Sequence, residues 1–575
     1  MNVHDILGHK QVSQKKRQQN GSTDSDPADG MPPQKMRKPN GVFPGEERVG
    51  HGELPAGFFD AETQEALRRM ESEPGAEPFD ETALRKLINA FDKKVLKNRE
   101  HRVKYSDDPT KFMDSEIELN DAIQEMHILA TQPDLYPVLV QMNFISTIIQ
   151  LLSHENSDIS IATVDLLQEL TDVDTLTESF EDASRLVDVL IKEQVVASLI
   201  QNMERLDETV KEEADGVHNT LSVLENILEF KPDSSDAVAK LGLLKWILKR
   251  LKLKMPFDAN KLYASEILSI LVQSNVETRR LLGEMDGVDV LLHQLAAFKR
   301  HDPPTGEEYE MMENLFNCLC SALLYSANRK LFLEGEGLQL MNLMLREKRQ
   351  SRNSAIKVLD FALSNDEGAP LCNKFVEILG LRTIFPLFMQ PPRQHKKRGL
   401  TQSEAEEHLC AIIASLARNT TGEPRQRFLG KFLETDLEKV ERITELHFQY
   451  TEKVAEEDRL IALEKESVDD ESDEDRQDEF DLRRLEKGGF TLQKIDAVIL
   501  EVYSDADVEV RNRIDRILRM RGVPRESVVQ SIKEYLAEIS EEKDSDSFIP
   551  DPSRRRDLKR LTDLSQQFLL ASTSS

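Results

Sequence analysis

The sequence predicts an all-α fold: an armadillo- or HEAT-type superhelical solenoid of about six to eight helical repeats with helical caps. The first observation is a period, since a short apolar helix, a charged turn and a longer apolar helix recur every 43 to 51 residues. The second is that the alternating apolar pattern of strands is scarce. The six repeat openings are NFISTIIQLL from Asn143, QVVASLIQNM from Gln194, GLLKWILKRL from Gly242, GVDVLLHQL from Gly287, GLQLMNLML from Gly337 and GLRTIFPLF from Gly380.

Composition divides the 575 residues into five predicted segments. Before the repeats, Leu84, Leu87, Ile88 and Phe91 share one helical face, which predicts a cap. After the repeats, helical patterns continue on both sides of VDDESDEDRQDE, whose like charges predict a solvated linker. The segments are a disordered tail at 1–78, an N-terminal helical cap at 79–142, armadillo-like repeats at 143–430, C-terminal helical units at 431–541 interrupted by the acidic linker 467–479, and a mobile C-terminal tail at 542–575.

The predicted N-terminal tail holds two basic clusters in an otherwise acidic chain. Their separation by 17 residues, Gln18 to Gln34, resembles a bipartite nuclear localisation signal with a longer spacer than usual. The alternative is a basic tail that arises by chance. The nuclear interpretation predicts a protein of the nucleus, with a signal formed by Lys15, Lys16, Arg17, Lys35, Arg37 and Lys38.

The charge balance restricts the class of partner. The chain has 75 Lys and Arg residues against 105 Asp and Glu residues, a net charge of −30. Direct binding to a nucleic acid needs a basic face, so none is expected. An acidic surface instead favours basic partners, or serves only solubility.

No motif of catalysis, cofactor binding or metal binding stands out. Phosphate-binding loops, HExxH and GxSxG are absent from the sequence, and the histidines are single and scattered. The four cysteines, Cys318, Cys320, Cys372 and Cys410, lie in apolar helical patterns and are expected to be buried, reduced thiols. Without an apolar leader or an 18-residue apolar run, neither secretion nor a membrane span is expected. We therefore predict a protein that is not an enzyme and needs no cofactor.

Polar residues interrupt the apolar face of each longer helix, and the inner face of a solenoid is built from such helices. Carboxylates and amides there would suit the Lys and Arg side chains of an extended peptide. The alternative is an ordinary solvated face. The predicted peptide-binding groove consists of Asp165, Glu169, Ser222, Asn226, Glu266 and Asn317.

The groove differs from that of importin-α, whose inner helices repeat W-x-x-x-N. The single tryptophan, Trp246, lies on an opening helix, and Arg250 stands four residues later. In the first repeat Asp165 and Glu169 occupy the tryptophan and asparagine positions. The stacking array is therefore missing, which disfavours a general import receptor, and Trp246 is expected in the core.

Specific strings resemble the beta-catenin-like protein 1 family. They include FMDSEIELNDAIQEMHILAT, DLLQELTDVDTL, RLDETVKEEADGVHNTL, KMPFDANKLY, GEGLQLMNLMLREK and LGLRTIFPLFM, in order between about residues 80 and 536. The resemblance implies a nuclear armadillo-type protein of the pre-mRNA splicing machinery. It also implies partners: proteins of the NineTeen complex, including its cell-division-cycle-5-like subunit, and basic localisation-type segments of splicing factors. No short motif of the family identifies the binding residues.

Three functions remain open at this level. The leading one is a non-enzymatic scaffold of the splicing machinery. The others are a nuclear import receptor or adaptor, which binding to Ran and nucleoporins would reveal, and a regulatory subunit of an enzyme complex. Self-association is compatible with all three.

Overall fold

The computed structural model describes residues 80–252, 255–394, 399–466, 474–541 and 552–571. Contacts divide the chain into two compact units, Met1–Asn89 and Ala90–Ser575. In the first unit the described residues begin helix α3 (Glu81–Lys104), where Leu84 and Ile88 are buried. The predicted tail 1–78, with both basic clusters, lies outside the described residues, so its localisation signal stays a prediction.

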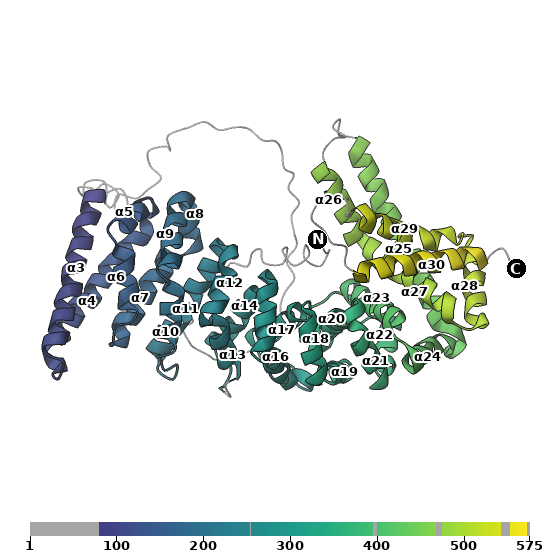
Figure 1. Cartoon of the computed structure of the whole chain (residues 1–575), viewed down its shortest axis with the longest axis horizontal. Helices are drawn as coiled ribbons and strands as arrows, with labels where there is room; N and C mark the ends of the chain where they lie inside the picture. Colours follow the sequence, from purple (N-terminus) through teal and green to yellow (C-terminus); the bar gives the residue numbers. More distant parts are fainter. Residues whose placement is uncertain (1–79, 253–254, 395–398, 467–473, 542–551, 572–575) are drawn as a thin grey trace, which may run out of the picture. The chain divides into compact units, whose positions relative to one another are not determined.

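Within Ala90–Ser575 the described residues form helices and no strand, which confirms the all-α prediction (Figure 1). The described residues form seven repeats of three helices: a further helix precedes each of the six predicted openings, and a seventh repeat follows them. The first helices are α5 (Tyr136–Gln141), α9 (Phe180–Lys192), α12 (Ser235–Val238), α15 (Val276–Glu284), α18 (Ser326–Glu334), α21 (Ala369–Glu377) and α24 (Gly422–Gly430). The second helices are α6 (Phe144–Leu151), α10 (Val195–Met203), α13 (Leu244–Lys252), α16 (Gly287–Leu295), α19 (Gly337–Glu347), α22 (Leu381–Met389) and α25 (Glu438–Glu466).

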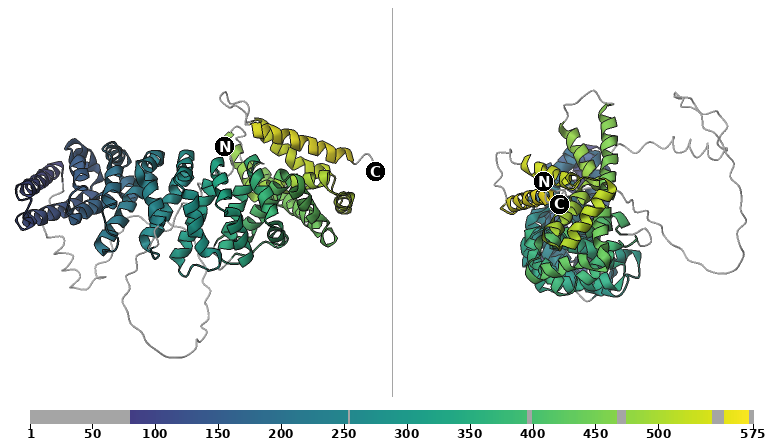
Figure 2. Two further views of the ribbon diagram at one scale, coloured as in Figure 1. Left: turned by 60° about the horizontal axis from the view of Figure 1, so that its bottom comes forward. Right: turned by 90° about the vertical axis from the view of Figure 1, so that its right-hand side faces the viewer.

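The third helices of these repeats form what we call the third-helix row. In the left view of Figure 2 the helices coloured from purple through teal follow one another in chain order. Each third helix contacts the third helix of the next repeat. The row consists of α7 (Ser157–Leu170), α11 (Lys211–Phe230), α14 (Ala259–Ser274), α17 (Gly306–Ala322), α20 (Ser351–Leu363), α23 (Gln402–Asn419) and α27 (Phe490–Asp505).

The remaining helices lie before, between and after the repeats. They are α4 (Met113–Glu125), α8 (Val173–Glu178), α26 (Glu474–Arg484), α28 (Val508–Arg521), α29 (Glu526–Glu541) and α30 (Pro552–Leu570). Short 3₁₀ turns connect several elements, at Pro109–Lys111, Met126–Thr131, Pro133–Leu135, Pro232–Ser234, Ala296–Lys299, Asp366–Gly368, Lys431–Leu433 and Thr435–Leu437.

A left-handed residue marks the turn from the first to the second helix in six repeats. The φ angles there lie between 56° and 119°, at Asn143, Gln194, Gly242, Asp286, Glu336 and Leu379. In three repeats a glycine follows the turn because there is no room for a side chain, and at Gly287 a Cβ would lie 2.5 Å from Leu282 Cγ. A Cβ at Gly337 would lie 2.3 Å from the Phe332 ring, and one at Gly380 would lie 2.5 Å from the Phe375 ring. The glycines that opened the predicted repeats thus permit close packing onto the preceding helix.

The C-terminal part differs from the prediction in two places. The acidic linker was expected to reach 479, but α26 starts at Glu474, and Arg483 pairs with Glu457 of α25 at 2.9 Å. Paired charges therefore support a helix where like charges predicted a linker. The tail predicted to be mobile from 542 contains α30, whose Phe568 is buried. The packing of Phe568 depends on residues of the same chain that lie far from it in the sequence.

Leu166, Leu167 and Leu170 of α7 are fully buried, which confirms the predicted core face. Replacing Leu167 by Ala should lower the free energy of unfolding by about 2–5 kcal/mol, because it leaves a cavity between packed helices. Leu463→Ala is the matched control, since Leu463 is 63% exposed. It should change stability by less than about 0.5 kcal/mol. Urea denaturation of both variants measures the difference, and equal midpoints would contradict this assignment of the core.

Candidate functional site

Side-chain caps start four of the helices of the third-helix row. The Asn156 side chain accepts the Asp158 N–H, and the Asp258 side chain accepts the Lys261 N–H at 2.8 Å. Thr305 caps α17 in the same way, and Thr401 forms a reciprocal capping box on α23. These caps satisfy backbone N–H groups that have no partner inside the helix. They therefore define where the helices of the row begin.

Polar contacts join neighbouring helices of the row about one repeat apart in sequence. Asn219 of α11 donates to Asp165 of α7 at 2.7 Å, and Asn314 of α17 donates to Ser265 of α14 at 3.3 Å. Further along, Ser354 donates to Glu313 at 2.6 Å, Lys357 donates to Asn317 at 3.0 Å, and His408 contacts Asp360 at 2.8 Å. The row is therefore linked by side chains on its polar face as well as by its apolar core.

Charge is distributed unevenly along the row. The four helices α7, α11, α14 and α17 carry thirteen carboxylates, two lysines and no arginine. Burial raises the pKa of the Asp165 carboxyl, and the hydrogen bond from Asn219 opposes this shift. Burial also raises the pKa of Glu313. A cation close to such a partly buried carboxylate stabilises its ionised form.

All six residues of the predicted groove lie on these four helices, and none is fully buried. The structure also gives several of them internal partners. Asp165 accepts from Asn219, Glu169 is exposed and lies 2.7 Å from His127 Nδ1, and Asn317 accepts from Lys357. The amide nitrogen of Asn226 is buried and has no hydrogen-bond partner among the residues that the structure describes. Ser222 and Glu266 are half-buried on α11 and α14. Peptide binding by this set stays a prediction.

A family model described as "Catenin-beta-like, Arm-motif containing nuclear" matches residues 61–533. The chain belongs to the catenin-beta-like family. It is 56% identical over 467 residues to "Beta-catenin-like protein 1" of Rattus norvegicus, covering 81% of this chain and 83% of that protein. The "Beta-catenin-like protein 1 homolog" of Schizosaccharomyces pombe is 31% identical over 466 residues, covering 80% and 79%.

A solved chain from work on a phosphorylation switch that controls the interaction between cadherin and beta-catenin is 12% identical. It covers 78% of this chain and 83% of its own length, with a TM-score of 0.39. The Arm-motif family and the helical repeats of the structure identify the fold as an armadillo-type solenoid.

Sequence analysis missed several carboxylates of this catenin-beta-like solenoid. Glu225 accepts the Tyr263 hydroxyl across two repeats, and Glu313 accepts from Ser354. Burial raises the pKa of Glu407 on α23. The signal was available for two of them, since Glu225 follows Ser222 by three residues and Glu313 precedes Asn317 by four, the spacings of one helical face.

The only tryptophan of the chain is 7% exposed, as expected for a core residue. It lies on α13, which is a second helix and not part of the third-helix row. Arg250, four residues later, is buried and pairs with Glu208 and Asp258, each at 2.7 Å. Arg250 thus joins neighbouring repeats through buried ion pairs and is not the asparagine that an importin-type array has four residues after its tryptophan.

One histidine–aspartate pair of this family member is packed inside. His447 lies 2.6 Å from Asp496, and both are buried. Among the described residues, no group of three His, Cys, Asp or Glu side chains is placed to hold a metal ion. No helix in the described ranges is long and apolar enough to cross a bilayer.

The thiols should be unreactive in the folded protein. All four cysteines are buried, and burial raises the pKa of the Cys320 and Cys372 thiols to about 12. The thiolate that attacks a disulfide reagent is then scarce at pH 8. Ellman's reagent should label the native chain slowly and all four thiols after guanidinium denaturation. Rapid labelling of the native chain, with its circular dichroism intact, would contradict the buried placement.

Proposed function

We propose that this armadillo protein of the catenin-beta-like family is a non-enzymatic scaffold of the pre-mRNA splicing machinery. In this proposal it binds basic localisation-type segments of splicing factors along α7, α11, α14 and α17. The observation that carries the proposal is the excess of carboxylates on these four helices, thirteen against two lysines. The sequence resemblance described above supports the splicing context and the NineTeen complex as the assembly.

The chemistry of the row suits an extended basic segment. Exposed carboxylates such as Glu169 and Glu229 attract lysine and arginine from solution, and partly buried ones such as Asp165 bind them more strongly. Amides at Asn226 and Asn317 offer hydrogen-bonding groups for a peptide backbone. Affinity should therefore combine long-range attraction with local hydrogen bonds.

The import-receptor alternative has less support. Such a receptor holds its cargo with an array of stacked tryptophans, whereas this chain has one tryptophan, buried on α13. Binding of the full chain to Ran loaded with GTP would favour that alternative. The enzyme-subunit alternative has no specific observation in its favour.

Reversing two exposed charges should weaken binding of a basic peptide. Glu169→Lys with Glu229→Lys removes two attractive charges and adds two repulsive ones, so the dissociation constant should rise by roughly tenfold. Fluorescence anisotropy of a labelled extended peptide with two Lys/Arg clusters measures it. The matched control is Glu193→Lys with Glu204→Lys, exposed residues next to α9 and α10 that make the same change in net charge.

The control pair should bind the peptide nearly as wild type does. Raising the salt concentration should weaken binding of the wild type, because charges separated by more than a Debye length of about 8 Å are screened at physiological ionic strength. If the test pair and the control pair weaken binding equally, the effect comes from net charge alone and the third-helix row is not the site.

The splicing assignment predicts specific partners in cells. A tagged full chain should co-purify NineTeen complex proteins, including the cell-division-cycle-5-like subunit, as identified by mass spectrometry. The Glu169→Lys, Glu229→Lys variant should lose those partners that present basic segments, while the Glu193→Lys, Glu204→Lys control keeps them. Recovery of importin-β and Ran without splicing proteins would overturn the scaffold proposal in favour of transport.

A further inference from the structure

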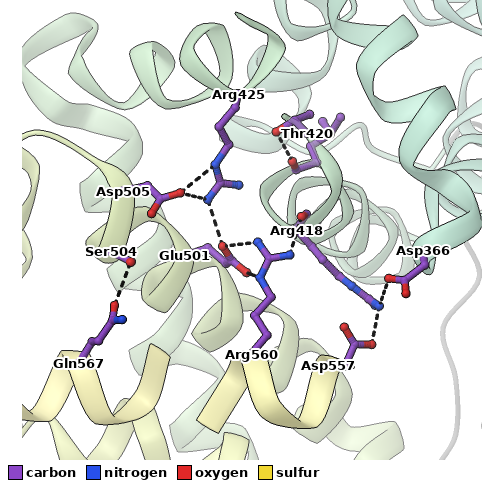
Figure 3. Close-up of polar contacts among 11 residues, drawn as sticks. Asp366, Arg418, Thr420, Arg425, Glu501, Ser504, Asp505, Asp557, Arg560 and Gln567 are labelled. Carbon is purple, nitrogen blue, oxygen red and sulfur yellow. Dashed lines mark hydrogen bonds and ion pairs between the residues drawn. The ribbon is translucent and has the colours of Figure 1, made fainter. Parts of the chain in front are cut away.

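The last helix of the chain lies on the C-terminal end of the third-helix row. Helix α30 contacts α27 and α29, and ten residues, 542–551, separate it in sequence from α29. Figure 3 shows side chains of α30 pointing toward α27 and toward the end of α23. The surface that α30 covers lies on the third-helix row, as the predicted peptide-binding groove does, but it belongs to different repeats.

Two ion pairs of opposite polarity hold the first half of α30. Arg560 is bidentate to Glu501 of α27, with both nitrogen–oxygen distances at 2.8 Å, and also donates to the backbone carbonyl of Arg418 at 2.8 Å. Asp557 pairs in return with Arg418, which binds Asp366 at 2.6 Å as well (Figure 3). Because α30 presents an arginine to a glutamate and an aspartate to an arginine, the two ion pairs fix both the position and the direction of the helix.

The second half of α30 is anchored by one aromatic ring. Phe568 is 1% exposed, and its ring meets Tyr503 of α27 edge to face, with centroids 4.7 Å apart. The Arg525 guanidinium lies 5.2 Å from the Phe568 ring centroid and donates to the Phe568 carbonyl at 2.6 Å. Ser504 adds a hydrogen bond to Gln567 at 3.1 Å. On a helix, positions 557, 560, 564 and 568 share one face, so these anchors form a single stripe.

This attachment is weaker in apolar burial than those of the repeat helices. Phe568 is the one buried apolar residue among the described side chains of α30, whereas α27 buries seven. Arg560 is 40% exposed although its partner Glu501 is 5% exposed. Hydrophobic burial dominates the energy of helix packing, so α30 is held chiefly by polar contacts that a similar ligand can replace.

The surface beneath α30 is complete without it. Glu501 keeps a second partner, Arg425, at 3.0 Å, and Arg425 also binds Asp505 at 2.8 Å. Tyr503 accepts from Arg525 at 2.7 Å, and Arg525 pairs with Asp515. These contacts lie within α24, α27, α28 and the segment before α29, so they would hold the carboxylate and the ring in place after α30 leaves.

We propose that the α27 surface under α30 is a docking site for a basic amphipathic helix of another protein, and that α30 occupies it as a reversible competitor in the same chain. The ligand presents an arginine to Glu501 and, eight residues later, a phenylalanine to Tyr503 and Arg525. An acidic residue three positions before the arginine meets Arg418. The proposal goes beyond the acidic groove, because it uses different repeats and a helical ligand in place of an extended one.

The tether explains why the site is closed in the free protein. A helix joined by a short linker has an effective concentration on the order of millimolar at its own site. A partner helix must overcome that advantage by higher affinity or by a second contact elsewhere on the solenoid. Loss of the Arg560 and Phe568 anchors removes the advantage and opens the surface.

The test uses the full chain and a fluorescein-labelled peptide of residues 552–570. In the chain variant Arg560→Glu with Phe568→Ala, the peptide should bind at least about tenfold more tightly than to wild type, because a desolvated arginine–carboxylate pair and a buried ring are worth more than one factor of ten. The matched control is Arg556→Glu with Leu570→Ala, exposed residues of the same helix. It should behave as wild type.

Adding Glu501→Gln to the opened variant should remove the gain in peptide binding. Arg560→Gln alone, which keeps Phe568, should give a smaller gain and serves if the double variant does not fold. Equal binding to wild type and opened variant, or binding to neither, would overturn the proposal. Adding Glu169→Lys and Glu229→Lys to the opened variant should leave binding of this peptide unchanged. The test can therefore contradict the docking proposal without contradicting the predicted peptide-binding groove, and the reverse.

Discussion

The structure depends on the burial of each third helix between the third helices of its neighbours. Val164, Leu167 and Leu170 of α7 are fully buried, and α7 contacts α11 as α14 contacts α17. A single repeat cannot bury this face alone, so stability arises from the interfaces between repeats. The polar face of the same helices is then held in register from repeat to repeat.

This constraint explains which features of the fold could be predicted from the sequence. The leucines at 166, 167 and 170 show the helical spacing of a buried face, and Trp246 lies in an apolar opening helix, so burial followed from local pattern in both cases. The glycines at 337 and 380 marked repeat openings correctly, although their physical role, contact with the Phe332 and Phe375 rings, becomes visible only in three dimensions.

Other features depend on contacts that no local pattern contains. The left-handed turns at Gln194 and Glu336 use residues that rarely adopt positive φ, and the packing of the flanking helices imposes them. The bonds from Asn219 to Asp165 and from Lys357 to Asn317 join residues 54 and 40 positions apart, so they require the register between repeats. These bonds also explain why groove candidates chosen as polar interruptions of an apolar face already have partners within the fold.

Removing a carboxylate from water costs free energy, and the two ends of the third-helix row offset this cost in different ways. At α27 the carboxylate of Glu501 is bound by two guanidinium groups, from Arg425 and from Arg560 of the chain's own last helix. At α7, no arginine or lysine in the described part of the chain is paired with Asp165, whose carboxyl accepts an amide hydrogen bond and has its pKa raised by burial. Bringing a cation to Asp165 would lower that pKa and favour the ionised form. On the proposals above, the same pairing of guanidinium with carboxylate is made within the chain at one end of the row and by a bound partner at the other.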